Sequence, residues 1–137
     1  MSRIRTPLAF TAVALFALSV VGALVADAGG IASFTSAVGP AGSKLSVPLP
    51  VLLVEVVGAL GAAFARVPVA RYACGIPSLL ASLLSLAAFA ADGDLGSSGL
   101  TSAQVGYQAL IGVTTLALVV LTAARLYESR RALTAVP

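Results

Sequence analysis

The chain has 137 residues, of which 59% are hydrophobic and 9% are charged, and its mean hydropathy is +1.06. Soluble domains are about half apolar and about one quarter charged, so this composition excludes an ordinary soluble globular domain. The net charge of +3 comes with no histidine and a single cysteine, Cys74, so the sequence predicts no metal site, no cofactor and no intrachain disulfide.

Four apolar segments are long enough to cross a membrane as helices, because about 18 apolar residues span roughly 30 Å of hydrocarbon. They lie at residues 7–26, 49–65, 72–91 and 104–124. Segments 27–47 and 92–102 form external loops between them, and residues 125–137 form a cytoplasmic tail. The sequence therefore predicts an all-α integral membrane protein with a single transmembrane domain, residues 1–137, folded as a four-helix transmembrane bundle.

The basic residues are unevenly distributed over this predicted bundle. If the four helices alternate in direction, Lys44 lies on the side of the loops and every arginine lies on the side of the termini: Arg3, Arg5, Arg66, Arg71, Arg125, Arg130 and Arg131. The positive-inside rule then predicts that both termini are cytoplasmic and that these arginines lie near lipid headgroups. Membrane topology thus accounts for the net charge, and we expect no nucleic-acid partner. Abundant alanine, valine and arginine are typical of GC-rich prokaryotic genomes, which favours a prokaryotic inner or plasma membrane.

The first apolar segment also has features of a secretory signal. Arg3 and Arg5 precede it, and residues 26–28 imitate a small-x-small cleavage site. The apolar run is longer than the roughly 7 to 15 residues of a signal sequence. We therefore expect a retained first helix.

The two external loops differ in character. Segment 27–47 is rich in Gly, Ser and Pro around an apolar island at residues 31–38; it either folds onto the external face, meets a partner or is mobile, because long structureless loops are uncommon in compact domains. Segment 92–102 contains Asp92 and Asp94, but it lacks the closing glutamate of an EF-hand calcium loop. We expect these two carboxylates to be solvated.

Glu55 is the acidic residue that hydropathy places inside the bilayer, in the second apolar segment. A charged side chain at the centre of a membrane helix costs about 2.5 to 3.5 kcal/mol on insertion scales, so Glu55 should face the bundle interior with a partner or be protonated. Counting residues inward from the external helix ends predicts an intramembrane polar cluster of Glu55, Gln108, Ser19, Ser82 and Ser85. This cluster is a hypothesis for a proton or cation relay, for recognition of a ligand's polar head, for a contact with a partner protein, or for hydrogen bonds that only fix helix register.

Small residues at spacings of three and four predict close packing of the second and third helices. They are Gly58, Gly61, Ala62, Cys74 and Ser78. Pro77 lies inside the third helix and predicts a kink there, because proline removes a backbone hydrogen bond.

Three functions remain compatible with this sequence. We expect a non-enzymatic structural or accessory subunit of a membrane assembly, bound to copies of itself as a homo-oligomer or to a larger membrane-protein partner. One alternative is an oligomeric transporter or channel for ions or small solutes that uses Glu55 as its coupling acid. The other is a structural membrane protein of an enveloped virus or a vesicle.

Overall fold

The computed structural model describes residues 3–40, 42–91 and 99–134. Three helices are long and apolar enough to cross a membrane: α1 (Arg5–Ala28), α4 (Pro68–Ala91) and α5 (Ser102–Thr134). Helix α3 (Leu49–Phe64) is apolar but shorter, and α2 (Phe34–Val38) is a short helix between α1 and α3. These helices indicate a helical, multi-pass membrane protein.

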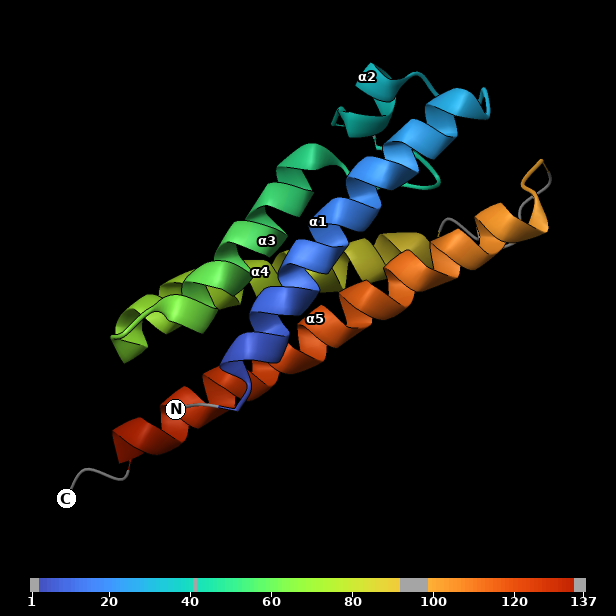
Figure 1. Ribbon diagram of the computed structural model, residues 1–137. Coiled ribbons are helices and arrows are strands. Elements are labelled where there is room, and N and C mark those ends of the chain that lie inside the picture. Colours follow the sequence, from blue (N-terminus) through green and yellow to red (C-terminus); the bar gives the residue numbers. More distant parts are fainter. Residues whose placement is uncertain (1–2, 41, 92–98, 135–137) are drawn as a thin grey trace.

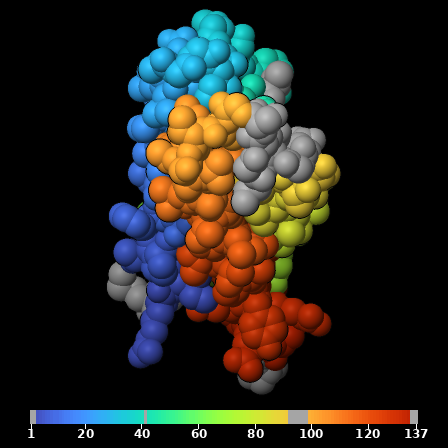
Figure 2. Space-filling view, turned by 90° about the vertical axis from the view of Figure 1, so that its right-hand side faces the viewer, coloured from blue at the N-terminus to red at the C-terminus, as the bar shows by residue number. Residues whose placement is uncertain are grey.

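The four longer helices are arranged around a common core. Helix α1 packs against α3 and α5, and α4 packs against the same two helices, so α1 and α4 occupy opposite corners. Figure 1 shows the first turns of α1, the last turns of α5 and the α3–α4 connection at one end of the molecule, and α2 at the other. We call the end with α2, residues 39 and 40 and residues 42–48 the loop end, and the opposite end the arginine end. Figure 2 shows that α5 projects furthest at the arginine end.

The core consists of small and branched apolar residues from α1, α3 and α5. In α1 the buried positions repeat every three or four residues, which gives one helix face that points inward. Helix α4 differs, because its buried residues are small or polar. The core of α1 comprises Leu8, Ala12 and Leu15, that of α3 Leu52, Val56 and Ala59, and that of α5 Ile111 and Leu118, whereas α4 buries Gly75, Ser78 and Ser82. Large apolar side chains cover the outer faces, including Phe10, Val57, Leu84 and Val113.

Segment 27–47, predicted as an external loop, is folded against the bundle. Helix α2 begins after Ser33, whose hydroxyl accepts a hydrogen bond from the Ser36 amide, and the Asp27 carboxylate accepts one from the Phe34 amide at 3.1 Å. Leu45 is fully buried, and its carbonyl lies against Gly22 of α1, where a Cβ would overlap it. The described residues of this segment, 27–40 and 42–47, thus close the loop end, where local capping and an apolar contact hold them against α1.

Several helix boundaries differ from the predicted ones because hydropathy detects apolar residues and not hydrogen bonding. Helix α4 begins at Pro68 and not at residue 72, since proline is well suited to a first helical turn. Helix α5 begins at Ser102, two residues before the apolar segment 104–124, where Thr101 and Gln104 exchange backbone and side-chain hydrogen bonds as a capping box. It continues to Thr134, so the tail predicted at residues 125–137 is helical as far as Thr134. Residues 92–98, including both loop aspartates, lie outside the described part of the chain.

Candidate functional site

Glu55 lies at the contact between α3 and α4 and is fully buried. The Ser85 hydroxyl donates a hydrogen bond to Glu55 Oε1 at 2.6 Å, and the Ser78 hydroxyl donates one to the Glu55 backbone carbonyl at 2.7 Å. Ser78 and Ser85 are two helical turns apart on α4, so they lie on the same face of that helix. Both the side chain and the backbone of Glu55 are thereby bound to α4.

The helices come close enough for these bonds because small residues line their contact. A Cβ added to Gly58 would lie 2.6 Å from the Cys74 carbonyl oxygen, and one added to Gly61 would lie 2.6 Å from Cys74 Sγ. Either distance is shorter than van der Waals contact, so a methyl group at Gly58 would push against the α4 backbone and one at Gly61 would displace the Cys74 side chain. A further small residue on α4 is Gly75, which faces Ala62 of α3; a Cβ added to Gly75 would lie 3.3 Å from the Ala62 Cβ. The structure thus brings all five small residues predicted for helix packing to this contact.

Apart from Ser85, the other members of the predicted polar cluster do not join Glu55 in a single network. Gln108 in α5 is buried, and its Nε2 donates to the Lys44 carbonyl at 2.9 Å, which attaches α5 to the loop end. Ser19 and Ser82 are buried as well, but in the described part of the chain their hydroxyls find no hydrogen-bond partner. The same is true of Glu55 Oε2 and of the Gln108 side-chain oxygen. The predicted cluster is therefore two separate hydrogen-bonded centres and two isolated serines.

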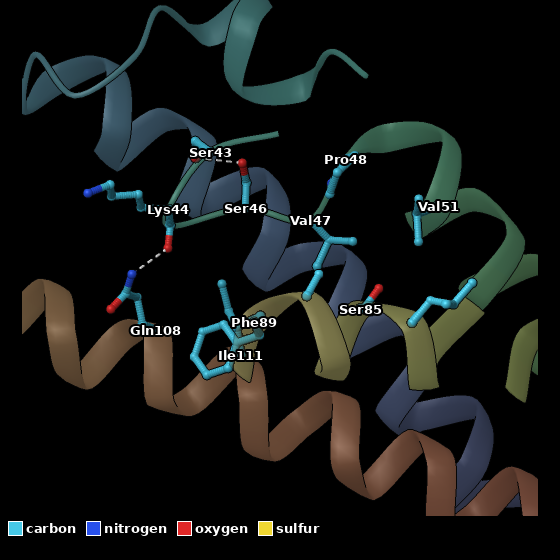
Figure 3. A pocket seen from close by; sticks show the side chains of 12 residues that line it. Ser43, Lys44, Ser46, Val47, Pro48, Val51, Ser85, Phe89, Gln108 and Ile111 are labelled. Carbon is cyan, nitrogen blue, oxygen red and sulfur yellow. Dashed lines mark hydrogen bonds between the residues drawn. The ribbon is translucent and has the colours of Figure 1, made fainter. Parts of the chain in front are cut away.

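A pocket of about 330 Å³ lies between the loop end and helices α3, α4 and α5. Figure 3 shows the side chains that surround it: Ser85 and Phe89 from α4, Gln108 and Ile111 from α5, and Ser43, Lys44, Ser46, Val47 and Pro48 from the loop end. Its walls are mainly apolar and are completed by Val51, Leu84 and Ala88. Glu55 itself does not line this loop-end pocket. Ser85 does line it, and its hydroxyl donates a hydrogen bond to Glu55, which lies behind the pocket wall.

The arginine end contains contacts between Arg125 and α3 that sequence reasoning did not predict. Arg125 is only 5% exposed, and its Nε and Nη2 donate to the Ala62 and Ala63 carbonyls at 3.3 and 3.4 Å. Its Nη1 also pairs with Glu128 at 3.1 Å. The guanidinium therefore satisfies two carbonyls at the end of α3 that have no helical donor. The sequence contains a weak signal for this role, since α3 has no basic residue in its own last turn.

Two further arginines contact the same end of α3. Arg71 donates from Nε to the Ala65 carbonyl at 2.9 Å and from Nη2 to the Arg66 carbonyl at 3.3 Å. The Arg5 guanidinium lies 4.6 Å from the centre of the Phe64 ring, in a cation–π contact. The predicted lipid-facing arginines thus form two groups. Arg5, Arg71 and Arg125 contact α3 or the residues that follow it, whereas Arg3, Arg66, Arg130 and Arg131 are exposed. Of these four, Arg131 lies 5.3 Å from the centre of the Tyr127 ring on its own helix.

Pro77 lies within α4, which continues from Pro68 to Ala91 on both sides of it. Because proline has no N–H, it cannot donate to the Ala73 carbonyl, and the kink expected there stays a prediction.

Residues 3–40, 42–91 and 99–134 contain no group of three or more His, Cys, Asp or Glu side chains placed to hold a metal ion. Comparison with protein-family models, with curated protein sequences and with solved structures finds no match for this chain.

Proposed function

We propose that α1, α3, α4 and α5 all cross the membrane, with both termini in the cytoplasm of a prokaryotic cell. Helix α3 has 16 residues and so spans about 24 Å, less than the roughly 30 Å of a typical hydrocarbon core. Arg71 and Arg125 bind the carbonyls at its C-terminal end, which supports a crossing by a short helix, because polar anchors compensate for such mismatch. The collection of arginines at one end supports the orientation.

We further propose that the protein is a non-enzymatic structural or accessory subunit of a membrane assembly. The observation that carries this proposal is the complete enclosure of Glu55, whose carboxylate and backbone carbonyl are both bound by α4 hydroxyls. An acid held in this way stabilises the association of two helices. If Glu55 serves helix packing, contacts with other proteins have to come from the outer surface of the bundle. Of the three long helices, α4 has the smallest fraction of buried residues. We propose that α4 carries the contact to a second copy or to a larger membrane protein.

The test compares two surface variants after extraction from the native membrane in a mild detergent, with mass spectrometry of the bound proteins. Leu80→Trp alters α4 and Val13→Trp alters α1, at two positions that are each 56% exposed. We expect the wild type to carry a stoichiometric partner or a second copy, Leu80→Trp to lose it and Val13→Trp to keep it. A monomeric wild type, or two variants that behave alike, would contradict the proposal.

A second candidate function is the transport of a small solute or ion with Glu55 as coupling acid. The observation in its favour is the hydrogen bond between Glu55 and Ser85, since Ser85 lines the loop-end pocket. Proton flux into liposomes measures this activity. The transporter should lose flux in Glu55→Gln and keep it in Glu128→Gln, whose acid lies at the arginine end. If liposomes with the wild-type protein show no more proton flux than protein-free liposomes, this candidate is excluded.

A further inference from the structure

We infer that the loop-end pocket binds one small, uncharged amphiphile, with an apolar body about the size of a two-ring aromatic and a hydrogen-bond-donating head directed at Ser85. The inference goes beyond the proposed subunit function and does not depend on it, because it concerns a cavity inside one chain.

The size and walls of the pocket determine the body of the ligand. Small-molecule pockets usually have volumes of about 300 to 1,000 Å³ and mostly apolar walls, and this pocket has about 330 Å³. Apolar side chains come from the loop end and from three helices: Val47, Pro48, Val51, Leu84, Phe89 and Ile111. The Phe89 ring lies beside Ile111 at the edge of the pocket (Figure 3) and offers an aromatic surface for stacking.

The hydroxyl groups of the pocket determine the head of the ligand. Each serine hydroxyl has one proton to donate and two lone pairs to accept with. Ser85 donates its proton to Glu55, and Ser46 donates its proton to the Ala37 carbonyl at 2.8 Å. Ser43 and Ser46 are 2.7 Å apart, so the bond between them uses the proton of Ser43. In the described lining the hydroxyls of Ser43, Ser46 and Ser85 therefore have only lone pairs left, so a ligand head that binds Ser85 must donate the proton.

The charges around the pocket determine that the ligand is neutral. Among the described residues the lining contains no carboxylate, and Lys44 is its one charged residue there. In Figure 3 the Lys44 side chain points away from the pocket, and its carbonyl is bonded to Gln108. Transfer of an ion into such an apolar space is strongly unfavourable without a paired charge. An alcohol, a phenol or a neutral amide fits the lining, whereas a carboxylate or an ammonium ion does not.

The experiment uses the full chain in lipid nanodiscs and two fluorescent probes, 2-naphthol and 2-methoxynaphthalene. The probes have the same ring system, but only the naphthol has a proton to donate. We expect saturable binding of one naphthol per chain above the signal of protein-free nanodiscs. The ether should bind about fivefold more weakly, as one hydrogen bond requires. Signals equal to those of protein-free nanodiscs would overturn the inference.

Two pairs of variants test the location and the head contact. Ala88→Phe fills the pocket and should weaken both probes at least tenfold, whereas Ala87→Phe, at the neighbouring position outside the lining, should leave both unchanged. Ser85→Ala should weaken naphthol about fivefold and leave the ether unchanged. An unchanged preference for naphthol in Ser85→Ala, or equal effects of the two Phe variants, would refute the assignment. If circular dichroism shows that Ala88→Phe does not fold, Val51→Phe fills the same pocket from α3.

Discussion

Ser85 of α4 donates a 2.6 Å hydrogen bond to the carboxylate of Glu55 in α3, and this bond joins two apolar helices at a buried position. Hydrogen bonds between membrane helices contribute about 0.6 kcal/mol on average and up to about 1.7 kcal/mol. Removing the donor from a buried acceptor costs more, about 1 to 3 kcal/mol of folding free energy, because the acceptor is left unsatisfied. The pair therefore matters both for the association of α3 and α4 and for the wall of the loop-end pocket.

We predict that Ser85→Ala lowers the free energy of unfolding by about 1 to 2 kcal/mol, because Glu55 Oε1 loses its donor. In a Glu55→Met background the same substitution should cost less than about 0.5 kcal/mol, since no acceptor remains. Unfolding by SDS in mixed micelles, followed by circular dichroism, measures both values. Thr114→Ala is the control, because that hydroxyl is exposed and bonds only within α5. Equal losses in the two backgrounds would contradict a direct coupling between Ser85 and Glu55.

The two glycines with different surroundings give a second prediction. A Cβ on Gly58 would lie 2.6 Å from the Cys74 carbonyl oxygen, whereas one on Gly106 would meet nothing within 4 Å. Gly58→Ala should therefore destabilise the protein by about 1 to 3 kcal/mol, because backbone has to move. Gly106→Ala should stabilise it by about 0.5 to 1 kcal/mol through helix propensity. The same SDS titration compares them, and a stable Gly58→Ala variant would mean that α3 and α4 are not in close contact there.

The long helices and the close contact of α3 with α4 follow from local sequence patterns. Apolar runs of the required length predict α1, α4 and α5, and spacings of three and four predict the Gly58 and Gly61 contact with Cys74. Counting residues from the helix ends also gave Glu55 and Ser85 similar depths. Depth and helical period are properties of one segment at a time, so a single sequence is sufficient to derive them.

Contacts that depend on how segments meet in space could not be derived. Gln108 was expected beside Glu55 but bonds to the Lys44 carbonyl, because the loop end folds over α5. Arg125 was expected among lipid headgroups, yet it turns inward because α3 ends nearby with free carbonyls. Neither the direction in which a side chain leaves its helix axis nor the proximity of a backbone carbonyl is encoded in hydropathy.

Arg125 gives the third prediction. Its guanidinium reaches the Ala62 and Ala63 carbonyls and Glu128 at the same time, and a lysine ammonium lacks this planar set of donors. Arg125→Lys should lower the free energy of unfolding by about 1.5 to 3 kcal/mol, the range for hydrogen bonds to charged groups. Arg130→Lys, on the exposed side of the same helix, should change it by less than about 0.5 kcal/mol. Equal values for the two variants would show that Arg125 does not hold the end of α3.

The orientation of α3 gives the fourth prediction, which labelling of single cysteines can check. Thr35 in α2 and Arg66 after α3 are both exposed and lie at the loop end and the arginine end. Each is replaced by cysteine in a Cys74→Ser background, and intact cells are treated with a membrane-impermeant maleimide. Thr35→Cys should be labelled from outside, and Arg66→Cys only after permeabilisation.

The two cysteines lie on opposite sides of the membrane only if α3 crosses it, because Thr35 precedes α3 and Arg66 follows it. The experiment therefore tests the number of spans as well as the orientation. Labelling of both positions in intact cells would mean that α3 lies at the surface, and the four-span proposal would then fail. The reversed pattern would keep four spans but place the arginines outside, against the positive-inside rule. The wild type, which keeps Cys74, provides a separate probe, because the Cys74 Sγ packs against Gly61. In a purified wild-type sample Cys74 should react slowly in the folded protein and quickly after SDS unfolding, which reports on the α3–α4 contact.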